Sequence, residues 1–460
     1  MALHHQNAVL RAMRGSNLCL LFWSLSMQNG YSVRTADRGL ILIKIRKTSI
    51  SKRIALLAFP LSALHLVSTD AIAADSAEYG DRPAQLIAGL PDGELRSTLQ
   101  ACAGNTAKQS LFSIAHRGAP LGYPEHTREG YIAAAKNGAG IIECDVTFTR
   151  DQELVCRHSQ CDLHTTTNIL ATPLAQKCSV PPDMSSNTPF SDVKCCASDL
   201  TVAEFKSLEG RFDSVNKKAG TLAEYLSLEG TPHAQSAGSG TLLTHAESIE
   251  LFKSLGVKMI PELKAPQVPM PFSFANGSQW TQEQYAQALV DEYRAHSVAP
   301  SDVYLQSFDL DDVKYWIKNE PEFGKQATWL DGRYRDRSFN VAKPRSWDPS
   351  MDELVDAGLT TLAPPIWMML DLDKNKNIVP SSYAKAASES GLELIGWTLE
   401  RSGSLENGGG WYYQTIKPAV KNDSAMYQAL HVLAEEVGVR GVFSDWPATT
   451  TYYANCFGKM

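Results

Sequence analysis

Alternating strand-like and helical segments predict an α/β fold, a (β/α)8 barrel with a cysteine-rich insertion after its second strand. The chain has 460 residues, 43% of them hydrophobic and 20% charged, which suits one large domain or two average ones. From about residue 80, apolar runs alternate with amphipathic stretches, as parallel βαβ units do. Eight strands separated by seven helices match the count of such a barrel, and a doubly wound open sheet is the alternative.

The expected strands are short apolar runs, at residues 112–116, 140–148, 257–263, 303–307, 326–330, 360–363, 393–399 and 441–444. The expected helices lie between them, at residues 128–137, 245–255, 282–296, 310–319, 351–357, 383–390 and 425–437. This alternation stops between His158 and about His245, where Cys, Pro, Ser and Thr are frequent and only 202–208 favours a helix. We therefore expect an insertion at 159–245, on the face of the barrel that carries active sites.

The N-terminal segment indicates export. Lys52 and Arg53 precede an apolar run at residues 54–67, and small residues follow at Ala71 and Ala73. This is the pattern of a secretory signal peptide, here at 52–74, and the apolar run is too short to span a bilayer. We expect residues 1–51 to be a spurious or disordered extension and 75–460 to form the barrel domain of a periplasmic or secreted protein.

Charge and cysteine content agree with export. Residues 1–74 hold nine basic and two acidic residues, which leaves 34 basic and 48 acidic residues and a net charge of −14. Such a body repels nucleic acid and anionic lipid, so we expect neither a nucleic-acid partner nor stable membrane insertion. Eight cysteines remain after residue 74, and some should form disulfides in an oxidising compartment.

The strongest candidate site lies between residues 114 and 158. His116 ends the first expected strand, and Gly118 allows a sharp turn there. Glu143 and Asp145 are two apart on the second strand, so both carboxylates face one side and favour a hard divalent cation, Ca2+ or Mg2+. His158 returns toward them after a turn, and two imidazoles beside a metal suit proton transfer in both directions.

Later strand ends add to this site. Glu262 closes the third strand as a third metal carboxylate, and Lys264 on the same face supplies a cation for an anionic substrate. The alternative for this pair is a simple ion pair at the barrel rim. Trp397 ends the seventh strand, where it packs against an alcohol or glycerol group or simply fills the rim. For Asp445, after the eighth strand, we expect a structural role as a loop cap.

These segments resemble the glycerophosphodiester phosphodiesterase family, from about residue 112 to 447. The resemblance rests on motifs that occur in order along the chain: His116-Arg117-Gly118, Pro124-Glu125-His126-Thr127, Glu143-x-Asp145, His158, Glu262-x-Lys264, Gln306-Ser307-Phe308, Trp397 and Ser444-Asp445-x-Pro447. The cysteine-containing insertion is similar to that of the larger exported members. Two positions depart from the family pattern, His126 where Asn is usual and Ser159 where an acid or Asn is frequent.

The resemblance implies metal-dependent hydrolysis of small-molecule glycerophosphodiesters to glycerol 3-phosphate and an alcohol. The histidine pair and the absence of a Ser or Cys nucleophile motif lead us to expect a cyclic phosphate on the way. The resemblance also implies that Glu143, Asp145 and Glu262 bind the cation, that His116 and His158 are the acid and base, and that Arg117, Lys264 and Trp397 bind substrate. One alternative is a lipid-cleaving enzyme on the same fold, similar to the spider-venom phospholipases D. Another is a non-catalytic barrel that binds metal or phosphate.

Two expectations concern cysteines. Cys156 and Cys161 flank His158, and we expect a disulfide between them that fixes the loop. Cys144 lies on the strand face opposite the two acids, where we expect a buried packing residue whose thiol the neighbouring acids do not need.

Overall fold

Ten parallel strand segments fill the eight positions of a closed barrel in the computed structural model. The structure describes residues 32–36, 40–44, 78–213, 216–228 and 238–460. Two barrel strands are interrupted, the second between β4 and β5 and the third between β9 and β10. The barrel strands are β3 (Ser110–Ala115), β4 (Ala139–Ile142), β5 (Asp145–Phe148), β9 (Lys258–Met259), β10 (Glu262–Leu263), β13 (Gln306–Ser307), β14 (Thr328–Leu330), β15 (Thr361–Ala363), β18 (Glu393–Gly396) and β19 (Gly441–Ser444).

The pairing of these strands confirms the barrel. β3 pairs with β4, β4 with β9, β5 with β10, and each following strand pairs with the next until β19 returns to β3, all in parallel. A buried cluster takes one side chain from each of the eight barrel positions: Ile114, Ile141, Ile260, Tyr304, Leu330, Ala363, Ile395 and Phe443. An open sheet has no such shared interior, so the doubly wound alternative does not hold.

Helices cover the outside of the barrel. They are α5 (Arg128–Lys136), α9 (His245–Leu255), α10 (Gln282–Ala295), α11 (Leu310–Asn319), α12 (Pro321–Gly324), α13 (Met351–Asp356), α14 (Ile366–Met369), α15 (Ser382–Glu389) and α16 (Ala425–His431), which continues as the π-helix Val432–Val437. Thr127 caps α5 by accepting a hydrogen bond from Gly130 N, as its position before the helix predicts. Besides the short α12 and α14, the described helices that were not predicted include α3 (Arg82–Ala88), α4 (Glu94–Ala101) and α17 (Ala448–Phe457).

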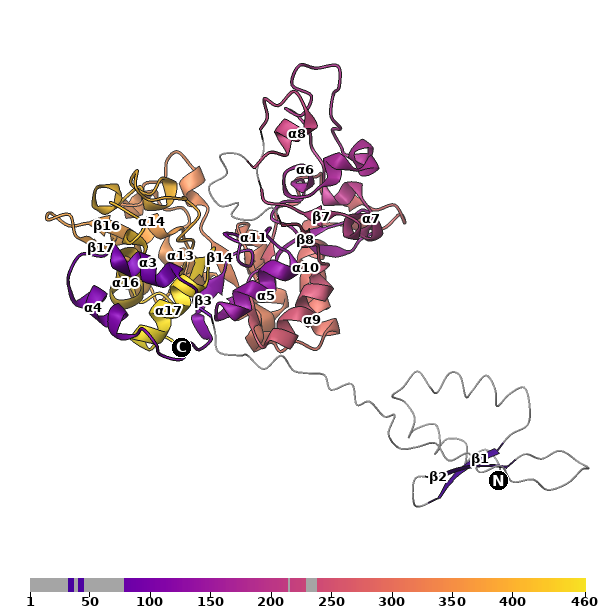
Figure 1. Cartoon of the computed structure of the whole chain (residues 1–460), viewed down its shortest axis with the longest axis horizontal. Coiled ribbons are helices and arrows are strands. Elements are labelled where there is room, and N and C mark those ends of the chain that lie inside the picture. The colour runs from indigo at the N-terminus through magenta and orange to yellow at the C-terminus, as the bar shows by residue number, and fades with distance from the viewer. Residues whose placement is uncertain (1–31, 37–39, 45–77, 214–215, 229–237) are drawn as a thin grey trace, which may run out of the picture. The chain divides into compact units, whose positions relative to one another are not determined.

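The insertion after the second barrel strand forms a lobe of its own, with α6, α7 and α8 together in Figure 1. It begins after β6 (Leu154–Cys156), which pairs antiparallel with β5. Its short elements surround a separate apolar cluster that includes Leu163, Phe205 and Tyr225. They are α6 (Leu163–Thr166), α7 (Val202–Lys206), β7 (Glu209–Gly210), α8 (Leu222–Tyr225) and β8 (Gly240–Thr241).

Four disulfides correct the cysteine predictions. Cys156 does not pair with Cys161, because β6 runs antiparallel to β5 and places Cys156 beside Cys144, with which it is bonded. Cys144 is therefore buried, as expected, but its thiol is not free. The insertion contains Cys161–Cys196 and Cys178–Cys195, and Cys102–Cys456 joins the ends of α4 and α17.

Two further hairpins lie outside the barrel, β11 (Phe272–Ser273) with β12 (Gln279–Trp280), and β16 (Leu370–Leu372) with β17 (Ile378–Pro380). Near the N-terminus, β1 (Ser32–Ala36) and β2 (Leu40–Lys44) form an antiparallel pair in a separate unit. The predicted signal peptide at 52–74 lies outside the described residues. Among the described helices, none has both the length and the apolar character needed to cross a bilayer.

Candidate active site

A cavity of about 500 Å3 opens at the carboxyl ends of the barrel strands. Six of the seven site residues predicted on the first three barrel strands and their loops line it, and so does Trp397. These residues are His116, Arg117, Glu143, His158, Glu262 and Lys264. Asp145, the seventh, lies beneath them and is buried. The structure thus brings together every residue that the sequence placed in the site.

Three carboxylates meet at the base of this cavity. Glu262 lies in register with Asp145 on one side and with Gln306 on the other, because β10 pairs with both β5 and β13. One carboxylate oxygen each of Glu143, Asp145 and Glu262 lies within 4.8 Å of the other two. All three residues are buried. The prediction that three acids from neighbouring strands converge is confirmed.

The carboxylates fit a divalent cation. Asp145 Oδ1 is buried and has no hydrogen-bond partner among the described residues. Burial and the charges of Asp145 and Glu262 raise the pKa of Glu143 well above its usual value. Burial likewise raises the pKa of Glu262 to about 7, although Lys264 Nζ lies 2.6 Å from its Oε1. Hard oxygen ligands that repel one another in this way are stabilised by a cation such as Ca2+ or Mg2+.

Hydrogen bonds hold the first two carboxylates in place. Glu143 accepts one from the Arg117 backbone N–H at 2.9 Å and one from Gln306 Nε2, also at 2.9 Å. Asp145 Oδ2 lies 2.9 Å from Nε2 of His126, whose Nδ1 contacts the Tyr131 hydroxyl. His126 is fully buried, and its ring contacts Asp145 rather than the cavity. This third imidazole, which is unusual for the family, therefore does not line the cavity.

His116 is paired with Asp445. Its Nδ1 lies 2.5 Å from Asp445 Oδ1, which leaves Nε2 on the side of Glu143, 4.0 Å from Oε2. Burial lowers the pKa of His116 to about 4, against the opposing effect of Asp445. The expectation that Asp445 is only a loop cap is therefore wrong, because β19 pairs with β3 and brings its end to the end of the first strand.

Arginines add positive charge next to this pair. Arg401 Nε lies 2.9 Å from Asp445 Oδ2, and Arg117 donates a hydrogen bond to Glu125 at 3.0 Å. Burial by itself would raise the pKa of Asp445, but Arg401 and His116 hold it at about 2. Sequence reasoning missed Arg401, since it lies in the loop after β18 with no motif around it.

The turn after His116 has a special backbone shape. Arg117 has φ 60° and Gly118 has φ 96°, and a Cβ on Gly118 would lie 3.0 Å from the Gly130 carbonyl carbon. Only glycine adopts such a conformation readily and fits so close to another backbone. The predicted sharp turn is confirmed, and it aims the Arg117 N–H at Glu143.

His158 lies at the edge of the insertion and lines the same cavity. Burial and the charges of Arg117 and Lys264 lower its pKa well below the usual value. Lys264 itself keeps a raised pKa because Glu262 and Asp145 outweigh the effect of its burial. The two histidines, the acids and the cations thus surround one cavity, as anion binding and proton transfer require.

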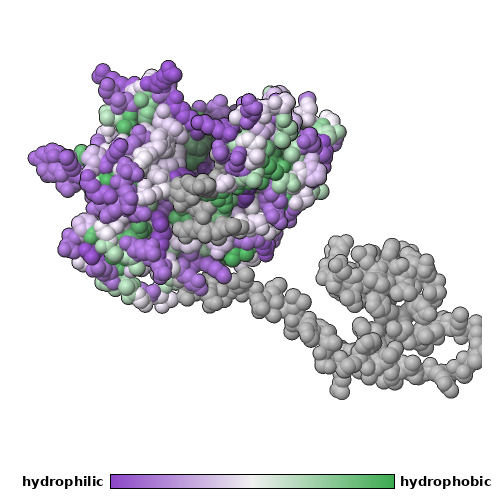
Figure 2. All heavy atoms as spheres, turned by 45° about the horizontal axis from the view of Figure 1, so that its top comes forward, coloured by the Kyte–Doolittle hydropathy of each residue, from purple (hydrophilic) through white to green (hydrophobic). Residues whose placement is uncertain are grey.

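Aromatic residues form the opposite wall. Trp397 lines the cavity beside Phe308, Tyr334 and Tyr412, with ring centroids 5.8, 6.3 and 6.0 Å away. Its indole N–H donates to the Ala363 carbonyl at 2.8 Å, which fixes the ring. Hydrophilic residues dominate the molecular face in Figure 2, with hydrophobic ones in small groups between them. The aromatic side chains thus give the cavity an apolar wall beside its charged residues.

Comparison with known proteins matches this geometry to one family. Residues 116–449 match the model of the glycerophosphoryl diester phosphodiesterase family. An "Extracellular protein" of Arthroderma benhamiae is 45% identical over 221 residues, 47% of this chain and 87% of that relative. The glycerophosphodiester phosphodiesterase of Haemophilus influenzae is 25% identical over 369 residues, 75% of this chain and 90% of that relative.

A solved structure from Silicibacter pomeroyi DSS-3, assigned to the same enzyme type, has a similar fold. It aligns with a TM-score of 0.50 at 17% sequence identity and covers 78% of this chain and 98% of its own. This likeness supports the barrel assignment.

Proposed function

The chain belongs to the glycerophosphoryl diester phosphodiesterase family and is a phosphodiesterase, and from that premise we propose its ligands and its mechanism. Its substrates are small glycerophosphodiesters, which it hydrolyses to glycerol 3-phosphate and an alcohol. The observation that carries this proposal is the meeting of three buried carboxylates, two histidines and two cations around one cavity.

Glu143, Asp145 and Glu262 would hold one divalent cation, Ca2+ or Mg2+. When bound, the ion supplies Lewis-acid polarisation of a phosphoryl oxygen and offsets developing negative charge. Arg117 and Lys264 bind the remaining phosphate charge, since both line the cavity next to these acids. Trp397 packs against the glycerol or alcohol group.

His116 and His158 transfer the protons. One imidazole removes the proton from the glycerol 2-hydroxyl, which attacks phosphorus and forms a cyclic phosphate. The other protonates the oxygen of the departing alcohol, and the roles reverse when water opens the ring. Asp445 accepts from His116 Nδ1 and so favours the tautomer whose Nε2 faces the cavity.

We also propose that the protein acts outside the cytoplasm. Four disulfides, an acidic body and the predicted signal peptide favour an oxidising compartment. The name of the Arthroderma benhamiae relative agrees with this location.

The test is release of glycerol 3-phosphate from several glycerophosphodiesters, with and without a chelator. We expect turnover that stops with chelator, returns with Ca2+ or Mg2+, and falls by roughly 100-fold or more in His158→Ala. His296→Ala is the control, since His296 lies at the end of α10 and does not line the cavity. Rapid hydrolysis of a diester without a neighbouring hydroxyl would refute the cyclic route, and full activity of His158→Ala would refute catalysis by this residue.

A further inference from the structure

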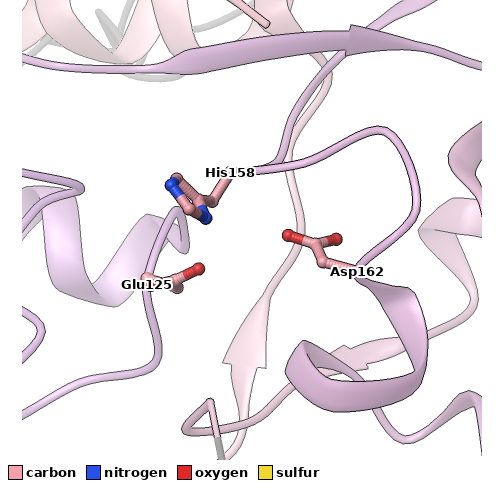
Figure 3. Close-up of side chains that lie close together, drawn as sticks. All are labelled: Glu125, His158 and Asp162. Carbon is pink, nitrogen blue, oxygen red and sulfur yellow. The ribbon is translucent and has the colours of Figure 1, made fainter. Parts of the chain in front are cut away.

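A second group of ionisable side chains lies behind His158, away from the three metal carboxylates. It consists of Glu125, His158 and Asp162, each of which has one nitrogen or oxygen within 4.8 Å of the others. Figure 3 shows the three side chains directed toward a common gap. Glu125 comes from the loop before α5, whereas Asp162 comes from the insertion.

Both carboxylates have an oxygen available for His158. Glu125 is 3% exposed and Asp162 is 8% exposed, and neither Glu125 Oε1 nor Asp162 Oδ1 has a hydrogen-bond partner in the described part of the chain. Asp162 precedes α6 at the N-cap position, yet its side chain does not cap that helix. Its Oδ2 accepts from the Ser159 N–H at 3.0 Å, which orients the carboxylate. Buried acceptors without a partner are costly, so these oxygens need a donor.

The surrounding structure holds this arrangement rigidly. Arg157 is fully buried and donates to the Glu125 carbonyl and to Thr166 in α6, so one side chain ties the two carboxylate-bearing segments together. The disulfide Cys161–Cys196 fixes the residue next to Asp162 to the core of the insertion. The position of Asp162 therefore depends on the folded insertion.

A second metal ion does not suit this group. Glu125 Oε2 is already 3.0 Å from Arg117 and 3.9 Å from Arg401. The charge of Arg157 acts on Asp162 as well. A divalent cation placed here would face three guanidinium groups, whereas an imidazole N–H fits two carboxylate acceptors without added charge.

We infer that Asp162, together with Glu125, positions the His158 imidazole, so that the cysteine-rich insertion supplies part of the frame of the active site. The inference rests on the proposed role of His158 in proton transfer. An acceptor behind one ring nitrogen keeps the proton there and presents the other nitrogen to the cavity. A separation of up to 4.8 Å is spanned by one water molecule or closed by a small rotation when substrate binds.

The test is Asp162→Asn in the full chain. Asn keeps an oxygen for the Ser159 N–H but turns an NH2 donor toward His158, which disfavours the productive tautomer. Burial, opposed by Arg157, raises the pKa of Asp162 to about 7, so assays are run at pH 8. We expect kcat to fall about 10- to 100-fold, with KM within about twofold and one metal ion per chain in both proteins.

The matched control is Asp199→Asn in the same insertion. Asp199 also accepts backbone N–H hydrogen bonds, from Ser179 and Cys196, but does not belong to the cluster around His158. An equal loss of kcat in both variants would contradict positioning, because weakening the insertion would then be sufficient. Unchanged kcat in a folded Asp162→Asn would also overturn the inference. A metal content that falls from two ions per chain in the wild type to one in this variant would overturn it as well. Asp162→Ser carries the same expectation should the Asn variant fail to fold.

A spectroscopic readout separates this inference from the proposed function. Nitrogen NMR of histidine-labelled protein, with His158→Gln to assign the signal, reports which ring nitrogen of His158 carries the proton. We expect that pattern to change in Asp162→Asn and not in Asp199→Asn. A wild-type chain that releases no glycerol 3-phosphate would refute the proposed function, while a changed tautomer would still support positioning by Asp162. An unchanged tautomer would refute the inference.

Discussion

The pairing of His116 with Asp445 allows a specific prediction about catalysis. Asp445→Asn replaces a carboxylate that has two partners, His116 Nδ1 at 2.5 Å and Arg401 Nε at 2.9 Å. The Asn side chain has one oxygen, which can accept from only one of these two donors. Its NH2 group then faces the second donor and repels it. Asp445 is 1% exposed, so water does not restore the lost acceptor. The substitution therefore favours the wrong His116 tautomer and leaves Arg401 without its full partner.

The size of the effect follows from the hydrogen bond that is lost. A hydrogen bond to a charged group contributes about 1.5–3 kcal/mol, which corresponds to roughly a 10- to 150-fold fall in kcat when it acts on a developing imidazolium. Asp445 raises the pKa of His116 against the effects of burial and Arg117. Removing its charge lowers that pKa further, so the limb of the pH–rate profile that reports His116 should move to lower pH.

The assay is glycerol 3-phosphate release over a range of pH, with kcat and KM determined separately. Asp331→Asn is the control, because Asp331 is also buried and paired with an arginine, Arg333, at 2.7 Å, but does not line the cavity. We expect it to lower the melting temperature without changing kcat. A kcat of Asp445→Asn within about threefold of wild type, with an unmoved pH profile, would refute the dyad.

Three further predictions concern stability. Saturating Ca2+ or Mg2+, at about 100 times Kd, should stabilise the protein by about 2.7 kcal/mol, and Glu262→Gln should lose most of this shift in a melting experiment. Burial raises the pKa of Glu400 to about 7, so its stabilising contribution is present below about pH 4.5 and lost as pH rises through 7. Glu400→Gln should therefore gain stability relative to wild type from pH 5 to pH 8, by at most about 3 kcal/mol. Replacing Cys144 and Cys156 with Ser should cost about 3 kcal/mol in denaturant unfolding and lower kcat, because the bond joins the strands of Asp145 and His158.

Each of these has a control and a contrary result. Glu322→Gln, on an exposed helix, should keep the full metal-induced shift; the same loss there would contradict the metal site. A stability difference between Glu400→Gln and wild type that does not change with pH would contradict the raised pKa. Serines at Cys102 and Cys456 should lower stability without lowering kcat, and a drop in kcat there would indicate general loosening.

Local patterns in the sequence were sufficient for the repeating units. The apolar run at β19 and the helices α9 and α11 have the predicted bounds. β3 begins two residues earlier than predicted, and the remaining barrel strands are shorter than predicted. Hydrophobic periodicity marks buried segments and not the residues that keep ladder hydrogen bonds. The predicted strand at 140–148 divides into β4 and β5, with Glu143 and Cys144 between them.

The sequence by itself determined the fold class and the shared face of Glu143 and Asp145, because alternation along a strand fixes which side chains share a face. Glu262 closes the next strand, and its meeting with these two acids depends on the pairing of β10 with β5. The tertiary structure decided the contacts between distant segments: Asp445 against His116, Arg401 against Asp445, and Cys144 against Cys156. These pairs depend on which strand ends become neighbours when the barrel closes. No local pattern in the chain encodes which distant segments will meet.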